Sequence, residues 1–214
     1  MDIALLKEDK EFIKLMSYYK CAMMEIETKF NVLNEEYTLT HERNPISVIK
    51  TRLKKPSSIV EKLSRRQLPL TLEAMEENLT DIAGVRVICS FPEDVYTLAG
   101  ALLQQDDVRL ITMKDYIANP KPNGYRSLHM IVEIPLFLAH QKRMMKVEIQ
   151  LRTIAMDFWA SLEHQLCYKK NNEFTDEMAS ELYECAEVSA ALDLRMDALR
   201  KRVQKQNAEK GNVV

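Results

Sequence analysis

Two short segments of this sequence place polar side chains where an ordinary core strand would not carry them. The first runs from Lys121 to His129 (KPNGYRSLH), and its Pro-Asn-Gly turn leads into a strand. The second runs from Val147 to Thr153 (VEIQLRT) and alternates apolar with polar residues, so Glu148, Gln150 and Arg152 share one face. A face of this kind is either an ordinary solvated surface or the wall of a binding site.

The side chains in these segments are of types suited to nucleotide binding and proton transfer. Tyr125 lies beside Arg126 and near Lys121 and His129, a combination that suits stacking on a base with phosphate contacts alongside. Glu148 is a candidate metal ligand or general base, because a nearby cation stabilises the charge that develops when a hydroxyl is deprotonated.

A third segment, Asp81 to Arg86 (DIAGVR), leads into another apolar strand. Arg86 alternates with two valines and should project from the opposite face of the strand. Asp81 and Glu148 are far apart in the sequence, but a sheet can bring them together around one Mg²⁺, which carboxylates and phosphate oxygens commonly hold. The simpler interpretation is a capping aspartate and a surface arginine.

A basic cluster precedes this segment. Between residues 43 and 66 the only acidic residue is Glu61, whereas the basic residues are Arg43, Lys50, Arg52, Lys54, Lys55, Lys62, Arg65 and Arg66. A local field of one sign attracts polyphosphates or a nucleic-acid backbone, although such a face is often merely solvated.

The elements that must position these residues indicate an α+β fold. Strands are expected near 85–90, 107–114, 127–135 and 142–152, and helices near 92–104 and 154–169. The last two strands are joined by a short connection and should form a hairpin. Residues 45–66 are expected to form one or two short helices broken at Pro56. We therefore predict a small mixed or antiparallel sheet of about four to five strands surrounded by helices.

Long amphipathic helices are expected at both ends of the chain. Apolar residues follow alternating gaps of four and three from Phe12 to Tyr37, and again from Met178 to Val203 with a lapse at Ser189. These seams can pack on the chain's own core, on each other or on another subunit. We divide the chain into an N-terminal helix (1–44), a central domain (45–170) and a C-terminal helix (171–214).

Composition limits the class of protein. The chain has 214 residues, 46% of them hydrophobic, and a net charge of -2 with a pI near 6.1, which argues against a general nucleic-acid binder. The four cysteines form no C-x-x-C pair, which is typical of reduced thiols in the cytosol. No signal pattern or membrane-spanning apolar run is present, so we expect a soluble cytoplasmic protein without membrane contact.

Taken together, the motifs resemble the synthetase domain of the RelA/SpoT homologue family. The matching segments are Arg52 to Lys54 with Ser58 and Lys62, residues 81–86, 115–117 (DYI), 121–129, 148–153 and 157–164 (DFWASLEH). Several motifs in the right order are far more specific than any one of them. The resemblance covers about residues 45–170, and within the family the chain is similar to small alarmone synthetases of the RelP type.

The resemblance implies a reaction and a set of roles. Family members transfer pyrophosphate from ATP to the 3′-hydroxyl of GDP or GTP, releasing AMP, in the stringent response. Asp81 and Glu148 would bind Mg²⁺, and Glu148 would also activate the hydroxyl. The residues implied for ATP are Arg52, Lys54, Ser58, Lys62, Arg65 and Arg86. Those implied for GDP or GTP are Lys114, Lys121, Tyr125, Arg126, His129, Gln150, Arg152 and Asp157.

Further expectations follow from the same resemblance. Long family members carry a hydrolase domain with a His-Asp pair, and no adjacent His-Asp pair occurs in this sequence, so we expect no hydrolase activity. Related small synthetases are homotetramers, a role that the two seamed helices fit.

Two other interpretations stay open at this point. A synthetase of the same family could modify the 3′ end of tRNA, although the overall acidity argues against it. A non-catalytic module could bind RNA or a partner through the basic helices, but it would not need Glu148. The sequence does not decide between GDP and GTP.

Overall fold

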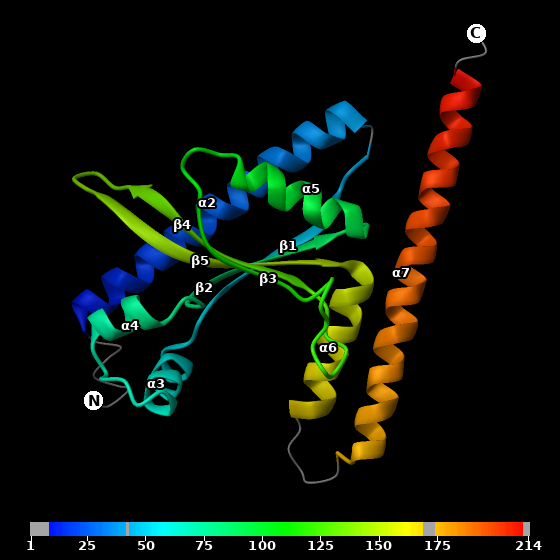
Figure 1. The fold of residues 1–214 in the computed structure, drawn as a ribbon. Helices are drawn as coiled ribbons and strands as arrows, with labels where there is room; N and C mark the ends of the chain where they lie inside the picture. Colours follow the sequence, from blue (N-terminus) through cyan, green and yellow to red (C-terminus); the bar gives the residue numbers. More distant parts are fainter. Residues whose placement is uncertain (1–8, 42, 169–173, 212–214) are drawn as a thin grey trace.

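A five-stranded mixed sheet lies at the centre of the protein (Figure 1). The computed structural model describes residues 9–41, 43–168 and 174–211. The strands, in spatial order, are β1 (Ile46–Leu53), β2 (Ala83–Cys89), β5 (Lys142–Thr153), β4 (Leu128–Phe137) and β3 (Arg109–Asp115). Neighbours pair antiparallel except β2 and β5, which run parallel. The sheet is therefore mixed, as predicted.

Two helices cover one face of this sheet. Helix α2 (Lys10–His41) packs on β1, β2, β4 and β5, and α5 (Pro92–Leu103) packs on β2 and β5 beside it. The seam of α2 is buried from Phe12 to Leu33, so this helix packs on the chain's own core. The sheet residues that face the two helices are apolar and buried, for example Val85, Val147 and Ile149.

The opposite face of the sheet carries the polar side chains and is bordered by helices at its two ends. Helices α3 (Pro56–Arg65) and α4 (Leu72–Asn78) lie at one end, and α6 (Ile154–Tyr168) and α7 (Asp176–Gly211) lie at the other (Figure 1). Pro56 occupies the first turn of α3, where its missing N–H is not needed. The polar face is thus left accessible between the two pairs of helices.

Helix α7 contacts the rest of the chain mainly through a stripe of small and polar residues, and among the described members of its apolar seam only Leu182 is partly buried. Ala186, Asp193 and Asp197 are buried on the inner stripe, and Ser189 donates to the carbonyl of Ala155 at 3.2 Å. The seam predicted from the sequence faces outward, because its members Met178, Leu192, Met196, Leu199 and Val203 are exposed. The lapse at Ser189 therefore marks the contact stripe.

The predicted strands and helices match the structure with one exception. The four expected strands are β2 to β5, and the connection 138–141 closes the β4–β5 hairpin, with Leu138 N donating to Gln141 O at 2.9 Å. The exception is residues 46–53, which we predicted as helix and which form the edge strand β1. Its β-branched residues Ile46, Val48, Ile49 and Thr51 favour a strand. The proposed domain boundary at 170/171 falls outside the described residues.

Two further sequence predictions concern the cysteines and the membrane. The cysteines are free thiols, as expected: Cys21, Cys89, Cys167 and Cys185. Among the described residues, no helix is both long and apolar enough to cross a membrane.

Candidate active site

A row of five polar side chains crosses the whole sheet. The strand register aligns Lys50 with Arg86, Arg86 with Gln150, Gln150 with His129, and His129 with Lys114. Residues in register on neighbouring strands point to the same face. The row therefore lies on the open face and joins the basic cluster of β1 to the 121–129 segment.

A second row begins beside the first and contains the smallest residue of the site. Gly84 stands in register between Arg52 and Glu148. These residues line a cavity of about 350 Å³ together with Lys50, Lys54, Asp81, Val85, Arg86 and Gln150. A Cβ at Gly84 would meet only the Arg52 carbonyl oxygen, at 3.4 Å. The absence of a side chain there leaves room above the sheet.

Asp81 is bound on one side by two lysines. Its Oδ2 accepts from Lys54 Nζ at 2.8 Å and from Lys62 Nζ at 2.6 Å. Burial raises the pKa of Asp81, but the hydrogen bonds from the two lysines outweigh this effect and hold the pKa below its usual value. Its Oδ1 is buried and has no hydrogen-bond partner within the described part of the chain.

Glu148 lies close enough to Asp81 for the two carboxylates to repel each other. Burial, and then the charge of Asp81, raise the pKa of Glu148 above its ordinary value. Gln150 donates to Glu148 Oε2 at 3.1 Å. An unpartnered Asp81 oxygen and a destabilised Glu148 carboxylate both fit a divalent cation placed between them, since Mg²⁺ takes one or two carboxylates plus phosphate oxygens.

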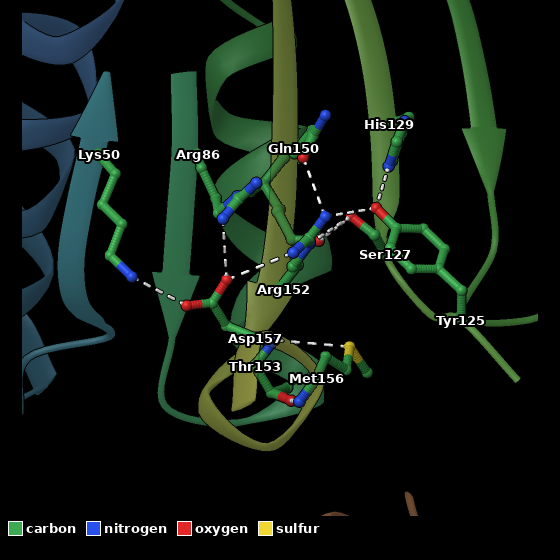
Figure 2. A network of polar contacts seen from close by, with 11 residues as sticks. Lys50, Arg86, Tyr125, Ser127, His129, Gln150, Arg152, Thr153, Met156 and Asp157 are labelled. Carbon is green, nitrogen blue, oxygen red and sulfur yellow. Dashed lines mark hydrogen bonds and ion pairs between the residues drawn. The ribbon is translucent and has the colours of Figure 1, made fainter. Parts of the chain in front are cut away.

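Asp157, in the first turn of α6, holds three cations (Figure 2). Its Oδ2 accepts from Lys50 at 3.0 Å, and its Oδ1 accepts from Arg86 and Arg152, each at 3.3 Å. The side chains come from β1, β2, β5 and α6, so this carboxylate fixes one end of the site across four elements. Arg86 Nε is buried without a partner among the described residues.

Arg152 connects Asp157 to Tyr125 (Figure 2). Its guanidinium donates to the Tyr125 hydroxyl and to Gln150 Oε1, the latter at 3.0 Å. The Tyr125 hydroxyl in turn lies 2.8 Å from His129 Nε2. Burial and the charge of Arg152 lower the pKa of His129 to about 4, so the ring is neutral at pH 7 and its Nε2 can accept a hydrogen bond from the Tyr125 hydroxyl. His129 therefore orients Tyr125 and supplies no positive charge.

The Tyr125 ring belongs to a small aromatic group. It meets Tyr116 edge-on at 6.1 Å between centroids, and Lys121 Nζ lies 4.7 Å from the Tyr125 centroid and 4.8 Å from that of Tyr116. Cations are attracted to the faces of such rings. The group stands at the far end of the polar row from Lys50.

The structure gathers most of the residues predicted for the site, but not all of them. The residues that line the cavity or the Asp157 network are Arg52, Lys54, Asp81, Arg86, Tyr125, His129, Glu148, Gln150, Arg152 and Asp157. Lys62 joins them through Asp81. Ser58 is half-buried and Arg65 exposed on α3, and Lys114 is exposed on β3. Arg126 is turned away, toward Glu187 of α7.

Sequence reasoning missed three contributors. Lys50 was noted only as part of the basic cluster, although it starts the cross-strand row. Ser127, fully buried, lies 3.4 Å from Arg152 Nε and donates to the Leu151 carbonyl. Tyr116 stands next to the acidic start of a matched motif and carried no separate signal. The alternation of Lys50 with Arg52 and Lys54 is typical of one face of a strand and could have identified Lys50 as a site residue.

Comparison with known proteins places this site in a family. Residues 51–173 match the family described as "Region found in RelA / SpoT proteins". GTP pyrophosphokinase YwaC of Bacillus subtilis (strain 168) is 49% identical over 185 residues, which are 86% of this chain and 88% of the relative.

Solved structures agree with the sequence match. Small alarmone synthetase 2 from Bacillus subtilis has a TM-score of 0.81 at 44% identity, covering 90% of this chain and 100% of that one. Small alarmone synthetase 1 from Bacillus subtilis, bound to its product pppGpp, has a TM-score of 0.82 at 34% identity, covering 92% and 100%. The chain therefore belongs to the family of the RelA/SpoT region, and it resembles the small alarmone synthetases along nearly their whole length.

Proposed function

We propose that this protein is a GTP diphosphokinase that transfers the pyrophosphoryl group of ATP to the 3′-hydroxyl of GDP or GTP, giving ppGpp or pppGpp and AMP. The observation that carries the proposal is the position of Glu148. It lies on the open face of the sheet between the basic side chains of β1 and β2 and the network that ends at Tyr125. A donor and an acceptor nucleotide bound on either side would meet at this carboxylate.

The donor side is built from the basic cluster. Arg52 and Arg86 project from adjacent strands beside Gly84, where a planar adenine could lie between two guanidinium groups. Lys54 and Lys62 already converge on the Asp81 carboxylate, and the ATP phosphates would meet the same two ammonium groups. Ser58 and Arg65 on α3 extend this surface.

The acceptor side is built around Tyr125. Its ring offers a stacking surface for guanine and is oriented by Arg152 and His129, while Asp157 stands at the edge of the same network. Lys121 and Lys114 supply positive charge for the acceptor's phosphates.

Glu148 would take the proton of the 3′-hydroxyl as the oxygen attacks the β-phosphorus. The bond from that phosphorus to the α,β-bridging oxygen breaks, and AMP leaves with the electron pair. Burial and the charge of Asp81 raise the pKa of Glu148, which favours proton uptake by this carboxylate before a metal binds. Asp81 and Glu148 would hold Mg²⁺, which supplies charge neutralisation for two polyphosphates.

The test is a thin-layer assay of purified protein with labelled ATP, Mg²⁺ and either GDP or GTP, beside Glu148→Gln. Label should appear in ppGpp or pppGpp, and the variant should lose it by about 10²- to 10⁴-fold, the range for removal of a general base. Label on tRNA instead, or unchanged product from the variant, would overturn the proposal. The ratio of the two products identifies the preferred acceptor.

We further propose a cytoplasmic homotetramer that makes the alarmone in the stress response and does not degrade it. The support for self-association is the outward seam of α7, which with Ile154 and Phe158 of α6 borders an apolar groove of about 1130 Å³. Light scattering should give four times the chain mass at micromolar concentration, and a monomer would refute this. Release of pyrophosphate from ppGpp with Mn²⁺ would refute the absence of hydrolase activity.

A further inference from the structure

Helix α7 lies directly against the turn formed by residues 121–126, which we call the 121–126 loop. This loop carries Lys121 and Tyr125 of the acceptor side. Its conformation is set by local bonds, since Gly124 N donates to Lys121 O at 2.8 Å and Tyr125 N donates to Asn123 Oδ1 at 3.2 Å. The position of this turn relative to the rest of the protein is fixed by contacts with residues outside the loop.

The closest of these contacts involves Gly124. The residue has φ of 86°, a conformation that favours glycine. A Cβ added there would come within 2.5 Å of the Ala186 Cβ and 3.4 Å of the Tyr183 ring, both on α7. The backbone of the loop therefore approaches α7 to a distance that only a glycine permits opposite a small residue.

Arg126 makes a second link between the same two elements. One of its guanidinium nitrogens donates to the Gly124 carbonyl at 3.1 Å, and the other donates to Glu187 Oε1 at 2.8 Å. The side chain of Arg126 is only 15% exposed, whereas that of Glu187 is 47% exposed. Arg126 thus fastens the loop to α7 instead of pointing into the cleft.

The third link lies behind the Tyr125 ring. Tyr125 packs against a small buried cluster of Trp159 and Ala160 from α6 and Ala186 from α7. Trp159 Nε1 donates to the Leu182 carbonyl at 2.9 Å, which joins the two helices at this level. The ring that would stack on the acceptor base is therefore supported from the rear by α7.

We propose that α7 forms the outer wall of the acceptor site and that Glu187 is a positioning residue for acceptor binding, acting through Arg126. The inference rests on the proposed function, because it concerns the acceptor side of that same site. Among the described residues, the cavity on the ATP side is lined by β1, β2 and β5 together with Lys54 and Asp81, and no residue of α7 belongs to its lining. Removing the contact of α7 at Glu187 should weaken binding of the acceptor nucleotide and leave ATP binding unchanged.

The experiment compares Glu187→Ala, Arg126→Glu, Glu187→Arg and the double exchange Arg126→Glu/Glu187→Arg. We expect Glu187→Ala to raise the KM for GDP about threefold to fivefold, the upper range for a partly exposed ion pair, with the KM for ATP unchanged within about twofold. Calorimetric titration with GDP alone should show the same loss. The double exchange should recover most of the affinity that either single reversal removes.

Glu177→Ala is the matched control, because Glu177 is an exposed glutamate near the start of the same helix. It should leave both KM values and the thermal midpoint at wild-type values. The inference is overturned if Glu187→Ala raises both KM values together, if it leaves GDP binding unchanged, or if the double exchange recovers nothing. Wild-type protein that binds GDP but makes no (p)ppGpp would refute the proposed function alone, and the titrations would still decide the role of Glu187.

Discussion

Replacing Asp157 by Asn should cost far more stability than removing Lys50, its exposed partner. Asp157 is 8% exposed, and the side chain of Arg152 beside it is 5% exposed. Removing one member of a buried pair leaves an uncompensated charge, which costs about 3–5 kcal/mol. Lys50 is 53% exposed and can rehydrate, so it adds little.

Asparagine retains one acceptor oxygen, so we expect Asp157→Asn to lower the free energy of unfolding by about 2–4 kcal/mol. For a chain of this length, that loss lowers the thermal midpoint by roughly 5–15 °C. The assay is differential scanning fluorimetry at one fixed protein concentration, since association would shift the midpoint. Lys50→Ala is the control and should lose less than about 1 kcal/mol. If Asp157→Asn melted no earlier than Lys50→Ala, Asp157 would not be the charge that holds Arg152 in place.

Three other perturbations have outcomes set by the same geometry. Glu148→Gln should lower activity by about 10²- to 10⁴-fold and yet raise the thermal midpoint at pH 7, because the raised pKa means that the folded state disfavours the charged form. Melts at a series of pH values should show this gain fading as the pH falls to about 4.5. Gly84→Val should raise the KM for ATP at least about tenfold, because the added side chain would enter the cavity. The side chain would not enter the core, so the thermal midpoint should stay within about 3 °C of wild type. An unchanged KM would contradict the proposed position of ATP. Because the pKa of His129 is low in the folded state, the unfolded chain binds the proton first, and the free energy of unfolding should fall as the pH drops from about 6.5 to about 4. In urea titrations across this range, His129→Gln should reduce the dependence of the unfolding free energy on pH.

Local patterns in the sequence were sufficient to predict β4 and β5, the hairpin that carries Glu148. The alternation from Val147 to Arg152 predicts which face of β5 is buried, and the structure confirms it, with Val147, Ile149 and Leu151 buried. The hairpin of β4 and β5 follows from the short connection between two such patterns. Period-two alternation is a local property, and a sheet with one covered face preserves it.

Features that depend on partners distant in the sequence could not be predicted in the same way. Residues 46–53 carry Lys50 and Arg52 on an edge strand, and this segment is held as a strand by its pairing with β2. The apolar seam of α7 suggested its packing surface, but the chain is contacted by the small and polar stripe next to it. Arg126 lies in a motif that we predicted to bind GDP or GTP, yet its side chain pairs with Glu187 of α7.

The ion pairs of the site explain how so many positive charges can share one cleft. Two aspartates hold five cationic side chains: Asp81 holds Lys54 and Lys62, and Asp157 holds Lys50, Arg86 and Arg152. Without these carboxylates the cations would repel one another and turn toward solvent. The fixed pairs keep the donors in place before a polyphosphate arrives, which is the arrangement that stabilises developing charge without reorganisation.

The same pairs impose a cost on binding, because a phosphate must compete with a carboxylate for each lysine. Asp81 is half-buried and its Oδ1 has no hydrogen-bond partner in the described part of the chain, so a cation bound there would weaken its hold on Lys54 and Lys62. ATP affinity should therefore rise when Asp81 is neutralised by a divalent ion. In this arrangement the Asp81 carboxylate and the two lysines proposed to bind phosphate are one coupled unit, and the contribution of neither can be assigned by single substitutions alone.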